Sequence, residues 1–160
     1  MIANGKVKRE ELFIVTKLES DYHKRKRVPK GIKMSLERLQ LDYLVHWPQS
    51  THPKNVDVLE TWLGMQDVLK TGLTRSIGVS NFDEKQLKRI SRNGSNIKPV
   101  TNEVFCNPYK NQKKMLSYLT QHNIRLTAYS PLGGNSRYAE TLLKDNTLFE
   151  IGRRHNVSTA

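Results

Sequence analysis

The sequence is poor in cysteine and has no long hydrophobic run. Cys106 is its single cysteine, which excludes an intramolecular disulfide and a cysteine-based metal cluster. No apolar stretch approaches the roughly 20 residues that a membrane-spanning helix needs. Residues 1–11 are polar and charged, unlike a signal peptide. We therefore expect a cytoplasmic protein with no membrane partner and no metal site.

Acidic residues are also scarce relative to basic ones. The chain has 15 Asp and Glu against 27 Lys and Arg, a formal net charge of +12. Such an excess raises the question of nucleic-acid binding, but the densest basic run, His23–Arg27, contains no aromatic residue and the other charges are dispersed. We interpret them as a solvated surface, and help in attracting an anionic cofactor or substrate is an alternative that is compatible with it. The nucleic-acid alternative would require DNA binding with a steep salt dependence.

Five short apolar runs alternate with longer amphipathic stretches. The runs fit buried strands and are Leu12–Val15, Leu44–Trp47, Ser76–Val79, Val100–Phe105 and Ile124–Tyr129. Helical spacing of apolar residues marks the other stretches, which are Ile32–Leu39, Leu59–Leu69, Asp83–Arg92, Lys113–Gln121 and Thr141–His155. Asn81 and Asp83 are candidate N-caps, and Gly72 is a candidate for the residue that ends a helix.

The alternation of strand and helix predicts the fold class. Repeated five times, it indicates an α/β fold with a parallel sheet. We find no linker that divides residues 1–160, so we interpret them as one domain.

Polar or aromatic residues stand at the end of every predicted strand. In parallel α/β sheets, functional side chains gather at the carboxyl ends of the strands. Reading only those ends gives Lys17, His46 and Trp47, Ser80 and Asn81, Asn102 and Glu103, and Tyr129 and Ser130. One such group would mean little, but five at the same end of successive strands predict a site there.

Five motifs, in this order, resemble the aldo-keto reductase family. They are Phe13–Leu18 (FIVTKL), Leu44–Pro48 (LVHWP), Arg75–Phe82 (RSIGVSNF, the most specific), Thr101–Val104 (TNEV) and Ala128–Gly133 (AYSPLG). The family's enzymes are (β/α)8 TIM barrels that reduce aldehydes or ketones to alcohols with hydride from NADPH. A complete barrel takes ~250 residues. The resemblance therefore implies an incomplete barrel of about five parallel strands, lacking the N-terminal strands and the C-terminal strand and helices.

The resemblance implies a catalytic role for two residues. The ammonium of Lys17 would lower the pKa of a proton-donating tyrosine, because a nearby positive charge stabilises the phenolate. His46 would donate a hydrogen bond to the substrate oxygen, and Trp47 would form a wall of the substrate pocket. The alternatives are an ordinary surface lysine, a half-buried packing histidine and a core tryptophan.

The resemblance also implies a cofactor site for NADPH, made of Ser80, Asn81, Glu103, Tyr129, Ser130 and Leu132. The first three would bind the nicotinamide carboxamide, Tyr129 would stack on the ring, and the last two would contact the pyrophosphate. Glu103 departs from the family, which usually has glutamine there, and an ionised carboxylate accepts hydrogen bonds but cannot donate them. Helix capping by Ser80 and Asn81 and core packing of Tyr129 are the alternatives.

Two parts of the family pattern have no counterpart in the sequence. The family's catalytic aspartate and proton-donating tyrosine precede the lysine strand, and residues 1–11 contain neither residue type. The last strand and the loop that reads the 2′-phosphate would follow Ala160, so the preference for NADPH is a family expectation.

Two functional hypotheses follow. One is an oxidoreductase with a small-molecule carbonyl substrate; the other is a catalytically inactive remnant that keeps partial cofactor binding or a protein-interaction role. We expect full-length relatives to be monomeric and this chain to self-associate through open sheet edges.

Overall fold

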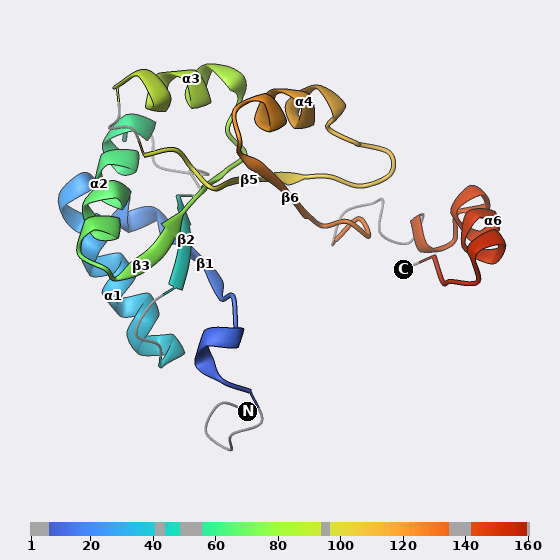
Figure 1. Ribbon diagram of the computed structural model, residues 1–160, viewed down its shortest axis with the longest axis horizontal. Helices are drawn as coiled ribbons and strands as arrows, with labels where there is room; N and C mark the ends of the chain where they lie inside the picture. Colours follow the sequence, from blue (N-terminus) through green and yellow to red (C-terminus); the bar gives the residue numbers. More distant parts are fainter. Residues whose placement is uncertain (1–6, 41–43, 49–55, 94–96, 135–141, 160) are drawn as a thin grey trace.

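The computed structural model describes residues 7–40, 44–48, 56–93, 97–134 and 142–159. Its strands form two parallel three-stranded ladders (Figure 1). The first contains β1 (Val15–Leu18), β2 (Leu44–Pro48) and β3 (Thr74–Ile77), and the second contains β4 (Val79–Ser80), β5 (Thr101–Phe105) and β6 (Arg125–Tyr129). Gly78 alone separates β3 from β4, so one chain segment belongs to both ladders.

Helices connect the successive strands, except β3 and β4. They are α1 (Val28–Leu39), α2 (Val58–Lys70), α3 (Glu84–Asn93) and α4 (Lys113–Gln121), and α6 (Asn146–His155) follows the last described strand. The structure also contains short 3-10 helices of one turn each, η2 (Arg9–Glu11), η3 (Ser20–Tyr22) and η4 (Arg25–Arg27). The predicted α/β fold with a parallel sheet is confirmed.

Several predicted boundaries were wrong. The first strand begins at Val15 and not at Leu12, because Val15 is the first residue of this run with a ladder partner, Val45. The third begins at Thr74 and is interrupted at Gly78. The last helix begins at Asn146 because the side chain of Asp145 caps it, accepting a hydrogen bond of 2.8 Å from the Leu148 N–H. Thr141, its predicted start, lies outside the described residues.

Of the candidate helix-capping residues, Asp83 and Gly72 are confirmed and Asn81 is not. Asp83 caps α3: its Oδ1 accepts from the Gln86 N–H at 2.8 Å, and the Gln86 Oε1 accepts from the Asp83 N–H at 3.0 Å. Asn81 was wrongly proposed as a cap. Gly72 follows α2 with a φ of +78°, in the left-handed conformation expected of a residue that ends a helix.

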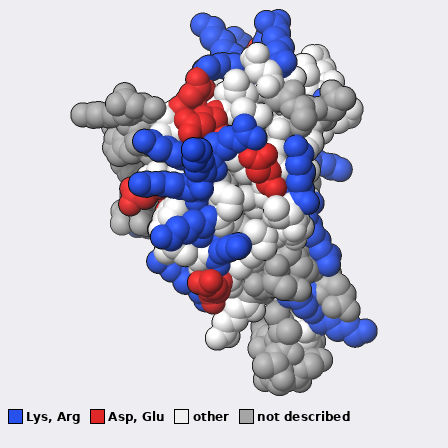
Figure 2. Space-filling model, turned by 90° about the vertical axis from the view of Figure 1, so that its left-hand side faces the viewer, with Lys and Arg blue, Asp and Glu red and all other residues white. Residues whose placement is uncertain are grey.

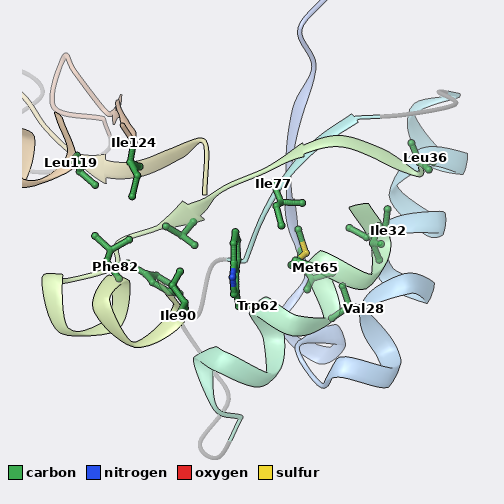
Figure 3. Packing of buried hydrophobic residues seen from close by; sticks show 14 residues of the cluster. Val28, Ile32, Leu36, Trp62, Met65, Ile77, Phe82, Ile90, Leu119 and Ile124 are labelled. Atoms are coloured by element: carbon green, nitrogen blue, oxygen red, sulfur yellow. The ribbon is translucent and has the colours of Figure 1, made fainter. Parts of the chain in front are cut away.

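The hydrophobic core lies between the helices and one face of both ladders. Trp62 and Met65 of α2 and Ile77 of β3 are fully buried, and Trp62 lies between Met65 and Ile90 of α3 (Figure 3). Close contact between α1 and α2 depends on Gly64, where a Cβ would lie 2.6 Å from the Val28 Cγ2. The same core therefore ties two helices to the strands that carry the predicted site.

The two faces of the sheet have different surroundings. α1 and α2 pack on β1–β3, and α3 and α4 lie over the second ladder, while α6 stands apart from both (Figure 1). Leu18 and Val104 are buried toward the helices. Val15 lies three positions before Leu18 on β1, so its side chain points to the opposite face, where it is 37% exposed.

Basic residues are spread over the outer, helical side. Figure 2 shows Lys and Arg side chains distributed there with Asp and Glu between them. Several are paired, including Arg25 with Asp67 and Arg89 with Asp57. No helix among the described residues is long and apolar enough to cross a membrane.

Candidate cofactor and active site

Lys17 and Glu103 form an ion pair. The Lys17 Nζ lies 2.7 Å from the Glu103 Oε1. The Glu103 side chain is only 11% exposed, whereas that of Lys17 is 40% exposed. A buried carboxylate that lacks a counter-charge is strongly destabilising. Lys17 supplies that counter-charge, so two predicted site residues from distant strands meet.

This ion pair requires a curved sheet. Lys17 is on β1 and Glu103 on β5, with β2 and the β3–β4 segment between them. Neighbouring strands are spaced about 4.8 Å apart, so three steps across a flat sheet would cover about 14 Å. The two side chains reach each other because the sheet bends toward the face that they share. They therefore lie on the concave face, which in a barrel is the interior.

The backbone of Glu103 holds the residues that follow β4. The Ser80 hydroxyl donates to the Glu103 carbonyl oxygen at 3.0 Å, and the Asn81 N–H donates to the same oxygen at 2.8 Å. Asn81 has a φ of +56°, a left-handed conformation that asparagine tolerates better than most residues. Ser80 is buried, and Asn81 is exposed at the end of the strand.

Asn102 fixes this turn from the other face of the sheet. It is fully buried, its Nδ2 donates to the Phe82 carbonyl oxygen at 2.9 Å, and its Oδ1 accepts from the Phe82 N–H at 3.3 Å. Sequence reasoning placed Asn102 at a strand end but gave it no role. The available signal was a strong hydrogen-bonding side chain in the middle of a buried strand, where an unpaired amide would be costly.

Tyr129 closes the cluster from β6. Its hydroxyl donates to the Asn81 Oδ1 at 3.2 Å, and its ring meets that of Phe105 edge to face with centroids 5.7 Å apart. The Lys17 Nζ lies 6.0 Å from the centroid of the Tyr129 ring. Residues from β1, the β4 end, β5 and β6 are thus brought together.

The segment after β6 is a tight turn. Ser130 has a φ of +52°, and its carbonyl oxygen accepts from the Gly133 N–H at 2.9 Å. A Cβ on Gly134 would lie 2.5 Å from the Ser130 Oγ. Leu132 is 43% exposed. Ser130 and Leu132 therefore follow directly from the cluster, at the open end of the strand.

For His46 and Trp47 only the backbone is described. Their Cα partners in β1 are Thr16 and Lys17, respectively, so both residues stand beside the lysine strand. Their side chains lie outside the described part of the chain. The loop after β2, residues 49–55, also lies outside the described residues.

The cluster offers the atoms that a nicotinamide carboxamide needs. A primary amide has two N–H donors and one carbonyl acceptor. Among the described residues, the only partner of the Asn81 Nδ2 is the Ser80 Oγ, at a long distance of 3.4 Å, so the Nδ2 can turn to a carbonyl. The Glu103 carboxylate can accept from the amide nitrogen while its Oε1 holds Lys17. The donor set therefore fits the group.

Known proteins resemble this chain along its whole length. The model of the Aldo/keto reductase family matches residues 1–160. Aldo-keto reductase AKR2E4 of Bombyx mori is 46% identical over 140 residues, covering 82% of this chain and 45% of that protein. Aldo-keto reductase family 1 member C1 of Pongo abelii is 37% identical, covering 99% of this chain and 57% of that protein.

Solved structures give the same result. The crystal structure of the Bombyx mori aldo-keto reductase AKR2E4 in complex with NADP has a TM-score of 0.87 at 38% identity, covering 99% of this chain and 55% of that one. The chain thus spans about half the length of the relatives that it matches, and over that length it has the strands and helices of their barrel. With the motif order, the fold and the family model in agreement, this chain belongs to the aldo-keto reductase family.

Proposed function

We propose that this chain carries the nicotinamide-binding and carbonyl-polarising part of an NADPH-dependent oxidoreductase that reduces aldehydes or ketones to alcohols. The observation that carries the proposal is the convergence of Lys17, Glu103, Asn81 and Tyr129 on one concave face. NADPH supplies the hydride when it is bound. The chain's own residues position the reactants and assist the proton transfer.

The cofactor is held by residues at the ends of β4 and β6 and in the middle of β5. Ser80, Asn81 and Glu103 bind the carboxamide, and Tyr129 stacks on the ring and fixes which side of it faces the substrate. Ser130 and Leu132 contact the pyrophosphate. Two related solved aldo-keto reductase structures are complexes with NADP and NADPH, which supports this choice of cofactor.

The substrate carbonyl is polarised from the neighbouring strands. Lys17 places a positive charge on the concave face and facilitates proton donation by a tyrosine. His46 donates a hydrogen bond to the carbonyl oxygen and Trp47 covers the substrate. Their backbone positions beside β1 support these roles.

The proposal is tested by titrating the purified chain with NADPH. The change in the fluorescence of the cofactor measures binding. We expect saturable binding that Tyr129→Ala weakens at least tenfold, because the ring loses its stacking partner. Tyr109→Ala is the matched control, since Tyr109 is 63% exposed outside the cluster. Absence of binding by the folded chain would overturn the proposal. Binding without reduction of any aldehyde would favour a cofactor-binding chain that is catalytically inactive.

A further inference from the structure

Glu103 places a negative charge inside the group of residues that binds the nicotinamide end. Its backbone oxygen accepts from Ser80 and Asn81, and its side chain reaches Lys17. Glutamine at position 103 would provide the same shape without the charge. The effect of that charge depends on the charge of the nicotinamide ring, because the oxidised ring is a cation and the reduced ring is neutral.

We propose that Glu103, with Lys17 as its counter-ion, sets the preference of this site between oxidised and reduced cofactor. The inference rests on the proposed function, because it assumes that the nicotinamide end binds at this cluster. A carboxylate beside the ring stabilises the cationic, oxidised form and leaves the neutral, reduced form almost unaffected. An ammonium near the same ring has the opposite effect.

Burial decides which charge has the larger effect. The Glu103 side chain is 11% exposed and that of Lys17 40% exposed, so water screens the lysine more. At 2.7 Å the two charges cancel in part, yet the carboxylate remains the less screened member. Relative to glutamine at position 103, the chain therefore favours the oxidised cofactor. Lys17 limits this preference and at the same time prevents the buried carboxylate from destabilising the fold.

The proposal predicts opposite effects for the two members of the pair. Glu103→Gln keeps the backbone oxygen that holds Ser80 and Asn81 but leaves Lys17 as the only charge. The ratio of the Kd for NADP⁺ to the Kd for NADPH should then rise about three- to tenfold. Lys17→Met leaves the carboxylate without its counter-ion, and the same ratio should fall by a similar factor. A purely structural role of the ion pair would weaken the binding of both forms alike and leave the ratio unchanged.

The experiment is calorimetric titration of the wild-type chain and each variant with NADP⁺ and NADPH separately, at one salt concentration. Glu19→Gln is the matched control, since it removes a carboxylate from the exposed pair with Arg38, and its ratio should equal that of the wild type. Near-ultraviolet circular dichroism checks that each variant is folded. If one variant unfolds, the shift of the Kd ratio in the other variant still tests the proposal.

The outcomes separate this proposal from the proposed function. Opposite shifts of the ratio in the two variants support the role of Glu103. An unchanged ratio, or a fall in Glu103→Gln, overturns it while binding by the wild type still supports the proposed function. Absence of binding of both nucleotides to the folded wild-type chain overturns both.

Discussion

At the scale of single residues, Asn102 joins the fold to the site. Its amide satisfies both backbone groups of Phe82, in the turn that carries Asn81. A buried N–H or C=O that loses its partner costs ~1–3 kcal/mol. The position of Asn81 on the concave face therefore depends on a side chain on the opposite, helical face.

We expect Asn102→Leu to lower the free energy of unfolding by about 2–4 kcal/mol, because two buried backbone groups lose their partners. Urea unfolding would measure the loss. Asn93→Leu, on the exposed part of α3, should change stability by less than about 0.5 kcal/mol. A fully stable Asn102→Leu protein would contradict the assignment.

His23 makes stability depend on pH. Its side chain is 1% exposed, and desolvation lowers its pKa, an effect that a hydrogen bond with the Leu18 backbone partly offsets. The folded state therefore resists protonation more than the unfolded state, in which the pKa is near 6.5. Stability is fully present above pH 6.5 and is lost as the pH falls below that value.

Removing this imidazole should remove the pH dependence that it causes. Between pH 7.5 and 5.5 the wild-type chain should lose stability through His23, and His23→Asn should lose less over the same range. The measurement is urea unfolding at each pH. His155→Gln, which changes an exposed histidine at the end of α6, should behave as the wild type does.

At the scale of helices, two aspartate caps allow a direct comparison. Asp83 caps α3, whose Leu87 and Ile90 belong to the core. Asp145 caps α6, which stands apart from both ladders and exposes Phe149 and Ile151. The local hydrogen bonds are similar, but only α3 is coupled to the core.

We expect Asp83→Ala to lower global stability by about 1 kcal/mol, since loss of a cap usually costs that much. Asp145→Ala should increase amide exchange within α6 and leave global unfolding almost unchanged. Urea unfolding with hydrogen exchange distinguishes the two effects. Equal global losses would show that α6 is coupled to the core after all.

The contact between α1 and α2 depends on the absence of a side chain at Gly64. Gly64→Ala places a Cβ 2.6 Å from the Val28 Cγ2 and should cost about 1–3 kcal/mol through overpacking. Combining it with Val28→Ala removes that clash, so the double variant should be more stable than the sum of the single losses predicts. Strict additivity in a double-mutant cycle would argue against the close contact.

The elements were more predictable than the contacts of the site. Apolar periodicity located the helices between strands, because apolar residues recur at helical spacing in each of them. It misplaced the start of β1, because ladder pairing and not composition decides where a strand begins. The residues at the strand ends were identified one by one. Their pairing was not, because the meeting of Lys17 and Glu103 depends on the curvature of the whole sheet.

At the scale of the whole molecule, the edges of the sheet lack strand partners within the described part of the chain. β1 pairs with β2 alone and β6 with β5 alone. Phe13, just before β1, is 73% exposed. Unpaired strand edges next to exposed apolar groups promote association between chains.

We therefore expect the 160-residue chain to self-associate at micromolar concentration. Phe13→Lys should shift sedimentation toward the monomer, because a charge beside an edge strand opposes pairing. Leu116→Lys, on the exposed side of α4, should have no such effect. A monodisperse wild-type monomer across the concentration range would contradict this expectation.

The order of strands in the two ladders has a consequence for the path of folding. β1, β2 and β3 pair in the order of synthesis, as do β4, β5 and β6. Each ladder can therefore assemble from neighbouring segments as the chain emerges from the ribosome, at low entropic cost of loop closure. The Lys17–Glu103 pair joins residues 86 positions apart and forms only after both ladders exist and bend. Its formation would mark the end of folding and the moment at which the proposed cofactor site is assembled.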